Sequence, residues 1–265
     1  MNVAFWVNII VPILAGLIYL ILILEVHRVK KIRKIMFGEI GYNKMFLAFL
    51  LLGIYLVTRP LQNIIGPHPW PMIINSLRQF FLMAVIAPAI LVGIFHWIPD
   101  KKSPPSKATM FAAYAVGFFM ALIFILINFV GISGSRIVAS IGNLKIYDPV
   151  WFAYGNTGMT LIFIHLISQF ISPVGIILLA AGFVRHKRHT YTMKAIYNQM
   201  PTKWRYLEAG LIIFPVSMII AGLAAFFGQY YTYLWVIYFI GAIIAGLVEL
   251  RGIQLPPRAS PADLR

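Results

Sequence analysis

The sequence predicts an all-α fold, a polytopic membrane bundle of seven transmembrane helices with its N-terminus outside and its C-terminus in the cytoplasm. Composition is the first reason: 61% of the residues are hydrophobic and 11% are charged, whereas about 25% charged residues are usual in soluble domains. The second reason is that the apolar residues fall into runs of about 20, the length that crosses a bilayer as a helix. The third is that basic residues concentrate in alternate loops, as segments that stay in the cytoplasm do.

The predicted spans, in chain order, cover residues 3–25, 45–65, 72–97, 108–132, 157–184, 206–228 and 233–250. The first run has no basic residue before it and no small-residue cleavage site, and a basic cluster follows it at 28–34. This order is the reverse of a secretory signal. We therefore expect the first span to stay in the protein as an anchor.

Polar or proline-rich segments separate the later spans. The second and third spans meet at the corner GPHPWP (66–71), DKKSPPSK (100–107) precedes the fourth, and QLPPRASP (254–261) follows the seventh. A residue before proline is disfavoured in a helix, so each of these segments marks a helix end. Prolines inside the spans, at positions 12, 88, 173 and 215, predict kinks whose freed carbonyls are satisfied by neighbouring side chains.

The distribution of charge predicts the orientation. Eighteen of the 22 Lys and Arg residues lie in the segments 26–44, 98–107, 185–205 and 251–265, which alternate along the chain. The net charge of +15 therefore reflects the concentration of basic residues on the cytoplasmic side of the membrane, and no nucleic-acid partner is expected. We expect a multi-pass protein of the cytoplasmic (inner) membrane, embedded in the lipid bilayer, with a transmembrane domain at 1–250 and a short cytoplasmic tail at 251–265.

Two arginines lie inside spans, and each belongs to a polar helix face near the expected outer side. The two faces repeat the spacing i, i+3, i+4, and they consist of Arg59, Gln62 and Asn63 on the second span and Asn75, Arg78 and Gln79 on the third. Residues at this spacing share one side of a helix. At a rise of about 1.5 Å per residue, both arginines lie roughly 10 Å below the GPHPWP corner. We expect the two faces to meet.

Two guanidinium groups at one level repel each other unless an anion lies between them. Asp148 is the only carboxylate expected on the outer side, so it can neutralise one arginine, and one positive charge is left over. This predicts a site for an anionic or acceptor-rich ligand, since the planar guanidinium fits a carboxylate or phosphate. His68 in the corner is a further candidate donor. The alternative is that the arginines extend to lipid phosphates and the amides only join the helices.

A second polar face lies near the middle of the fifth span. It consists of His165, Ser168, Gln169 and Ser172, and Asn128 on the fourth span is a candidate partner of His165. Polar groups are costly in lipid, so this stripe is expected to face protein. A haem held by two histidines would need a second deep histidine, which the chain lacks. No cofactor is predicted, although a one-histidine haem or a quinone hydrogen bond at His165 stays open beside a packed histidine.

Catalytic machinery is poorly represented. The seven carboxylates are all expected at helix ends, in loops or in the tail: Glu25, Glu39, Asp100, Asp148, Glu208, Glu249 and Asp263. No pair is therefore placed for acid–base chemistry within the membrane. The absence of cysteine excludes disulfides and thiolate sites, and the seventh span has no lysine for a retinal Schiff base. We predict no enzyme, no catalytic residue and no metal site.

The order of these features resembles the seven-span assembly-factor family of caa3-type cytochrome c oxidase. The similarity lies in the first span with Tyr19 before a basic loop, in RQFFLMAVIAPAILVG (78–93), and in WRYLEAGLIIFPVSMIIAGLAAFFGQYY (204–231). The resemblance implies a protein that helps a terminal oxidase to acquire copper or to assemble its metal-bearing subunits. This chain has Arg78 and Gln79 where that family has histidines, so copper handling does not carry over.

Three hypotheses for the function follow. The leading one is a non-catalytic accessory or assembly subunit that binds a partner, expected to be another membrane protein subunit, through the outer Arg/Gln/Asn cluster. The second is a receptor-like seven-helix sensory module, in which an anionic ligand at Arg59 and Arg78 shifts kinked helices and signals through a partner. The third is a small transporter or a quinone-reactive subunit that uses the stripe around His165.

Overall fold

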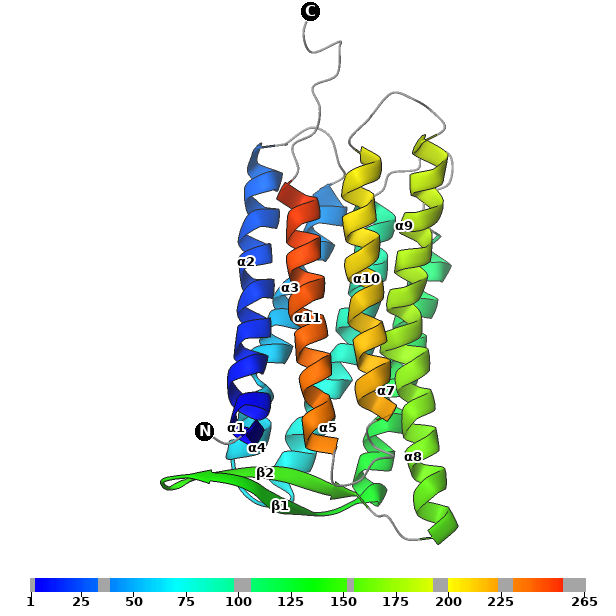
Figure 1. Cartoon of the computed structure of the whole chain (residues 1–265). Helices are drawn as coiled ribbons and strands as arrows, with labels where there is room; N and C mark the ends of the chain where they lie inside the picture. The colour runs from blue at the N-terminus through cyan, green and yellow to red at the C-terminus, as the bar shows by residue number, and fades with distance from the viewer. Residues whose placement is uncertain are drawn as a thin grey trace, which may run out of the picture.

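The structure, a computed structural model of the chain, describes residues 3–32, 39–97, 106–151, 155–192, 200–223 and 231–254. Within these ranges, long helices run side by side, and a β-hairpin lies across one end of the bundle (Figure 1). We call this the hairpin end. The opposite end, which we call the basic end, carries Arg188, whose Nη1 lies 3.0 Å from Glu208 Oε2. Among the described residues, seven helices are long and apolar enough to cross a membrane, as predicted for a multi-pass membrane protein with seven spans.

Most spans are built from more than one helical element. The first span consists of α1 (Val3–Phe5), η1 (Trp6–Ile10) and α2 (Val11–Ile32). The second consists of α3 (Glu39–Val57) and α4 (Arg59–Ile64). The third consists of α5 (Trp70–Phe81), η2 (Leu82–Ile86) and α6 (Ala87–Trp97). The others are α7 (Lys107–Gly131); α8 (Gly155–Gln169), η3 (Phe170–Gly175) and α9 (Ile176–Thr192); α10 (Met200–Leu223); and α11 (Tyr231–Gln254). Several helices continue past the predicted apolar runs, while residues 224–228 of the sixth predicted span and 255–265 of the tail lie outside the described residues.

Wider helical turns lie at three of the four prolines that were predicted to kink their spans. The wider π-helical turns η1, η2 and η3 precede or contain Pro12, Pro88 and Pro173, whereas Pro215 lies within the continuous helix α10. At the third kink Ser172 leaves the helical conformation, and its hydroxyl donates to the backbone oxygen of Met83 at 3.0 Å. A neighbouring side chain therefore satisfies a carbonyl at η2, as membrane helices with prolines require.

The all-α prediction is wrong in the segment between the fourth and fifth spans, which was expected to be a loop. This segment forms an antiparallel hairpin of β1 (Ile132–Ile141) and β2 (Leu144–Trp151). Gly142 in the connecting turn has φ +57°, a conformation that glycine adopts without steric cost and that tight hairpin turns need. The hairpin lies flat over the bundle, with β2 packed against α4 and α5 and the turn reaching past the helices (Figure 1).

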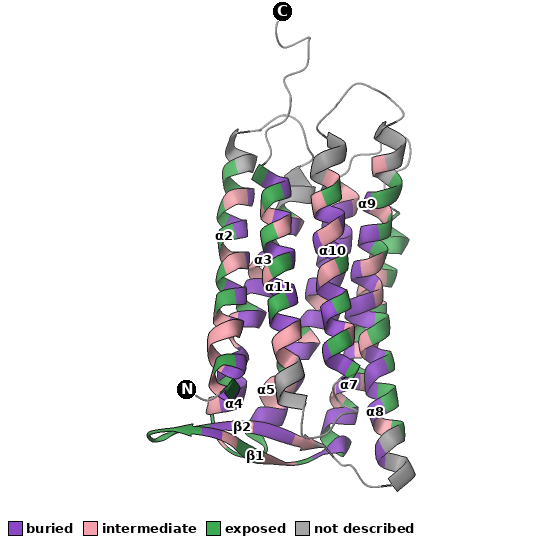
Figure 2. Cartoon of the chain, viewed as in Figure 1, coloured by how far each residue is buried: buried purple, intermediate pink, exposed green. Residues whose placement is uncertain are grey.

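Burial follows the arrangement expected for a protein surrounded by lipid. The inward faces of the helices are buried and many outward faces are exposed (Figure 2). The core holds large apolar side chains such as Tyr19, Phe49 and Phe239. The exposed side chains are also apolar, for example Leu24 and Phe111, which are 70% and 75% exposed. An apolar outer surface on helices of spanning length is what contact with lipid requires.

Candidate functional site

The two polar faces predicted around the GPHPWP corner meet at the hairpin end. Arg59 Nη1 donates to Gln62 Oε1 at 2.8 Å, and Arg78 Nη1 donates to the same oxygen at 2.6 Å. The prediction that the two arginines lie at one level on opposite arms is thereby confirmed. A neutral amide oxygen occupies the position between them at which an anion was expected.

The break between α3 and α4 explains how Arg78 is held. Pro60 has no N–H, so the regular hydrogen bonding of the helix is interrupted here. The Thr58 hydroxyl donates back to the carbonyls of Ile54 and Tyr55, at 2.8 and 3.1 Å. The Tyr55 carbonyl also accepts from Arg78 Nη2 at 2.6 Å and Nε at 3.2 Å. The third span is therefore tied to an interruption in the second.

Both guanidinium groups are buried and have neutral surroundings. Arg59 and Arg78 are 4% and 7% exposed, so they do not extend to lipid phosphates, as the alternative hypothesis required. Arg59 lies over the Trp235 ring, 5.2 Å from its centroid, and Arg78 lies 4.4 Å from the centroid of Tyr55. Cation–π contacts contribute about 0.5 to 2 kcal/mol each, less than the several kcal/mol that burial of one charge costs. The hydrogen bonds of the two guanidinium groups go to the neutral groups of Gln62, Tyr55 and Thr58.

A small polar cavity of about 10 Å³ lies beside this cluster. Its polar lining consists of Arg59, Gln62, Asn75, Gln79, His165 and Gln169. A space of this size holds about one water molecule. Arg59 Nε and Gln79 Oε1 are buried without a hydrogen-bond partner among the described residues, so a single water that accepts from one and donates to the other would satisfy both.

The cavity joins part of the mid-membrane stripe to the arginine cluster. Gln169 Nε2 lies 2.9 Å from His165 Nε2, and the His165 ring packs against Phe124 with centroids 4.4 Å apart. A haem or a quinone ring does not fit in a cavity of about 10 Å³, so the geometry at His165 supports neither cofactor. The stripe instead contributes two polar side chains to the same interior site as the arginines.

The other stripe residues make structural hydrogen bonds elsewhere. Ser168 donates to the carbonyl of His165 in its own helix at 2.7 Å, and Ser172 bonds to η2 as described above. Asn128 Nδ2 donates to Ser76 Oγ at 3.0 Å, which ties α7 to α5. The predicted polar stripe is therefore divided between the cavity and contacts that join helices.

Asn63 and His68 of the predicted outer cluster do not line the cavity. Asn63 is fully buried, and its Nδ2 donates to Asn8 Oδ1 at 2.6 Å, which links α4 to η1. His68 is exposed at the corner, and its backbone N–H donates to Ser135 Oγ at 2.8 Å. Neither side chain takes part in the arginine site, although both residues fix the elements around it.

Asp148 belongs to the hairpin that covers the site. Its side chain is buried, and Oδ2 lies 3.7 Å from Nη2 of Arg136 on the paired strand. Asp148, which was expected to neutralise Arg59 or Arg78, forms an ion pair with Arg136 within the hairpin. The next residue, Pro149, lines the cavity, so the hairpin closes the site over the ends of α4 and α5.

Residues that the sequence analysis did not select complete the site. Tyr55 lies four residues before Arg59 and seven before Gln62, a helical spacing that could have revealed it. Its hydroxyl accepts from Gln79 Nε2 at 3.0 Å. Trp235 on α11 has no such local signal, because only the tertiary arrangement of the helices places its ring against Arg59.

One carboxylate also differs from its expected environment. Glu249 was expected at a helix end, and it lies in the last turns of α11, where its side chain is buried with 3% exposure. Its side chain packs directly against Gly210 of α10, where any side chain would clash with it. Glu249 Oε2 has no hydrogen-bond partner among the described residues. An ionisable group inside a span is therefore present near the basic end, far along α11 from Trp235.

The chain matches no protein-family model, and no curated protein or solved structure is significantly similar to it. The functional argument accordingly rests on the chemistry of the site. In the ranges that the structure describes, no group of three or more His, Asp or Glu side chains could hold a metal ion. What the site offers is two guanidinium groups, several amides and an imidazole around one small interior space.

Proposed function

We propose that the protein is a receptor-like membrane protein that binds an anion through Arg59 and Arg78 at its hairpin end and performs no catalysis. The observation that carries this proposal is the shared neutral acceptor: two buried guanidinium groups donate to one amide oxygen, Gln62 Oε1. A buried charge without a counter-ion is costly, and an anion bound between or beside the guanidinium groups would remove much of that cost. The burial of the cluster favours a ligand that enters the protein over a partner that docks on the arginines.

The surroundings of the cavity support a signalling role. Gln79 lies three residues before η2, and Gln169 directly precedes η3. Helical π-turns of this kind are frequent at functional sites, because they allow a helix to change its hydrogen bonding locally. A ligand that alters the contacts of these two amides would act on two distorted spans, both of which continue to the basic end. The basic surface there is the side we expect to face a signalling partner in the cytoplasm.

The proposal is tested by thermal unfolding of purified protein, followed by tryptophan fluorescence, in acetate, chloride, phosphate and sulfate at constant ionic strength. A bound ligand stabilises the folded state in proportion to its occupancy. We expect at least one of these anions to raise the unfolding midpoint of the wild type, and R59Q and R78Q to lose that response. R251Q, a variant at an exposed position of the basic end, is the matched control and should respond like the wild type.

A folding defect in R59Q or R78Q would leave their lost response unexplained, so Q62E provides a second measurement. It places a carboxylate where both arginines already donate, and a folded Q62E protein should no longer respond to added anions. The proposal is wrong if no anion stabilises the wild type more than the variants. It is also wrong if folded Q62E responds as the wild type does.

A second candidate is the accessory or assembly subunit suggested by the resemblance in layout. Its support is the exposed apolar side of the hairpin, where Ile137 and Ile141 are 51% and 43% exposed, together with α7, the least buried span. These surfaces suit another membrane subunit. Purification in mild detergent followed by mass spectrometry tests this role: a stoichiometric partner that I137S loses and S140A retains would support it, and a chain that purifies alone would exclude it.

A further inference from the structure

Glu249 lies on the buried face of α11, inside the seventh span. It is 3% exposed, and Ala245 and Ile253, one helical turn on either side of it, are 0% and 5% exposed. Opposite it on α10 is Gly210, where an added Cβ would lie less than 3.0 Å from Cγ, Cδ and Oε1 of Glu249. The carboxyl group is therefore packed among apolar residues and against a position of α10 that has no side chain.

The titratable groups around Glu249 do not provide a counter-ion. The long helices α10 and α2 pack along α11. On α2, Tyr19 lies within electrostatic range of the carboxyl group, and on α10, Tyr206 lies one turn before Gly210. Both are phenols, which are neutral near pH 7. On α11 itself, Arg251 is exposed, and residues two positions apart do not share a helix face. Among the described residues, Glu249 Oε2 has no hydrogen-bond partner.

Two other glutamates near the basic end differ from Glu249, because each has an arginine partner. Glu25 Oε1 lies 3.6 Å from Arg28 Nη1, and Glu208 Oε2 lies 3.0 Å from Arg188 Nη1. A neighbouring positive charge favours the ionised form of a carboxyl group. The ionised form of Glu249 would instead be an uncompensated charge inside a span, which is costly and marks such a residue as a candidate functional site.

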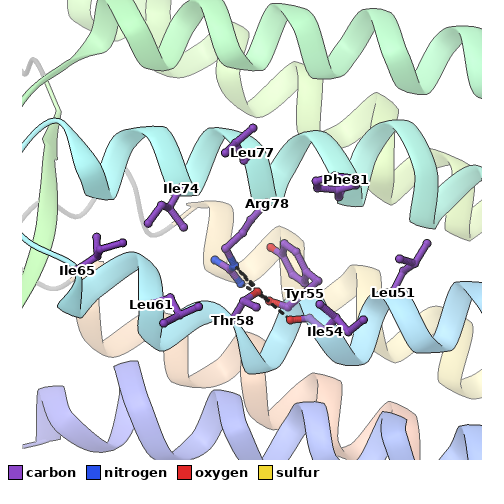
Figure 3. A pocket seen from close by; sticks show the side chains of 10 residues that line it. All are labelled: Leu51, Ile54, Tyr55, Thr58, Leu61, Ile65, Ile74, Leu77, Arg78 and Phe81. Atoms are coloured by element: carbon purple, nitrogen blue, oxygen red, sulfur yellow. Dashed lines mark hydrogen bonds between the residues drawn. The ribbon is translucent and has the colours of Figure 1, made fainter.

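The arginine cluster shows how the same bundle holds a charge that cannot be removed. Arg78, whose guanidinium does not lose its proton in proteins, donates to the Tyr55 carbonyl and to the Thr58 hydroxyl (Figure 3). A carboxylate differs, because binding one proton makes it neutral. A metal ion needs several oxygen ligands, and in the part of the chain that the structure describes no group of three or more His, Asp or Glu side chains could hold one. The ligand that these surroundings select is a proton.

We propose that Glu249 is a proton-binding site of the bundle, which exchanges its proton with the basic end. At a rise of about 1.5 Å per residue, Glu249 lies about 8 Å along the helix axis from Gln254, the last residue of α11, and about 21 Å from Trp235 at the arginine cluster. The basic end is therefore the nearer source of protons. Loss of the proton would leave a charge against Gly210 and loosen the contact between α10 and α11. This inference goes beyond the proposed function and does not depend on it.

The experiment is labelling of the purified full-length protein with dicyclohexylcarbodiimide, an apolar reagent that reacts with protonated carboxyl groups. The carboxyl O–H adds across one C=N bond, its proton passes to nitrogen, and the acyl group then migrates to nitrogen. The stable N-acylurea retains every atom of the reagent, so mass spectrometry of peptides locates it. Glu25 and Glu208 are matched controls within the same chain, since both have arginine partners. At about pH 7 we expect Glu249 to be labelled about tenfold or more above both controls.

The pH dependence of stability gives a second measurement, which does not need the reagent to reach the site. In the unfolded chain Glu249 is ionised above about pH 6, so a folded state that binds a proton there loses stability as the pH rises. E249Q has no proton to lose. We expect the unfolding midpoint of the wild type to fall relative to that of E249Q between about pH 6 and 9.

Three results would overturn the proposal. The first is parallel pH dependence of the two unfolding midpoints. The second is labelling of Glu249 at or below the level of Glu25 and Glu208, which would indicate a counter-ion. The third is protection of Glu249 from the reagent when sodium replaces a bulky organic cation at constant pH, which would indicate a metal-cation site. Preferential labelling that falls as the pH is raised, together with diverging midpoints, supports the proton site.

Discussion

Replacing Gln62 with glutamate is the most informative perturbation of the site. In the wild type, Gln62 Oε1 accepts from Arg59 at 2.8 Å and from Arg78 at 2.6 Å. Q62E keeps the shape of the side chain and places a negative charge between two positive ones. If the buried arginines lack a counter-ion, Q62E should stabilise the protein, whereas most substitutions of a fully buried polar residue destabilise it.

The size of the effect follows from the two hydrogen bonds. Hydrogen bonds between membrane helices contribute about 0.6 kcal/mol on average and up to about 1.7 kcal/mol, and ionising a partner makes such bonds roughly twice as strong. With desolvation of the new carboxylate opposing this gain, we expect Q62E to raise the free energy of unfolding by about 1 to 3 kcal/mol. Q62L removes the acceptor from both guanidinium groups and should lower it by a similar amount or more.

Thermal unfolding in detergent, followed by the fluorescence of the chain's six tryptophans, measures both changes. A difference of 1 kcal/mol moves the midpoint by roughly 2 to 4 °C in proteins of 150 to 250 residues. Q254E is the matched control, since Gln254 is exposed at the end of α11 and the same substitution there should leave the midpoint within about 1 °C. The reasoning is refuted if Q62E lowers the midpoint as much as Q62L does.

Three further predictions concern Glu249, the close approach of α10 to α11, and the orientation. E249Q should raise the unfolding midpoint, because the amide replaces a buried carboxylate whose Oε2 has no hydrogen-bond partner among the described residues. A lower midpoint would reveal a counter-ion. G210A should lower the free energy of unfolding by about 1 to 3 kcal/mol, because the added methyl group overpacks against Glu249. G182A is the control, since a side chain there meets nothing within 4 Å, and it should leave the stability unchanged or raise it. In intact cells, an impermeant maleimide should label S140C in the hairpin and not K107C at the basic end, because the hairpin is expected outside. The chain has no other cysteine, so each label reports one site. The reverse pattern would show that the orientation is inverted.

Much of the arginine site could be predicted from the sequence because its members are close in the chain. Arg59, Gln62, Arg78 and Gln79 lie on two consecutive spans joined by a short corner, so helical spacing alone predicts that their faces meet. The same spacing includes Tyr55, which was overlooked because an apolar body with one hydroxyl is common in membrane cores. Asn63 also fits the spacing and His68 lies in the corner, yet neither residue lines the cavity. Helical spacing determines which residues share one side of a helix, but it does not determine which neighbouring helix that side contacts.

The hairpin was missed for a different reason. Residues 132–151 include Arg136, Lys145 and Asp148 and form no continuous apolar run, so the hydrophobic pattern predicts a loop there. Their pairing depends on a turn at Gly142 and on packing of β2 against α4 and α5. That pairing places Asp148 opposite Arg136, a partner that the sequence analysis did not predict for it.

The sequence by itself determined the class of the protein, the number of spans and the pairing of the two arginine-bearing faces, because hydrophobic length and helical periodicity are local properties of the chain. Only the tertiary structure decided what surrounds those arginines. Trp235 and His165 reach the site from the seventh and fifth spans, and Gln62 lies where an anion was expected. Such contacts between distant spans depend on how helices pack, and no spacing within a single helix encodes them.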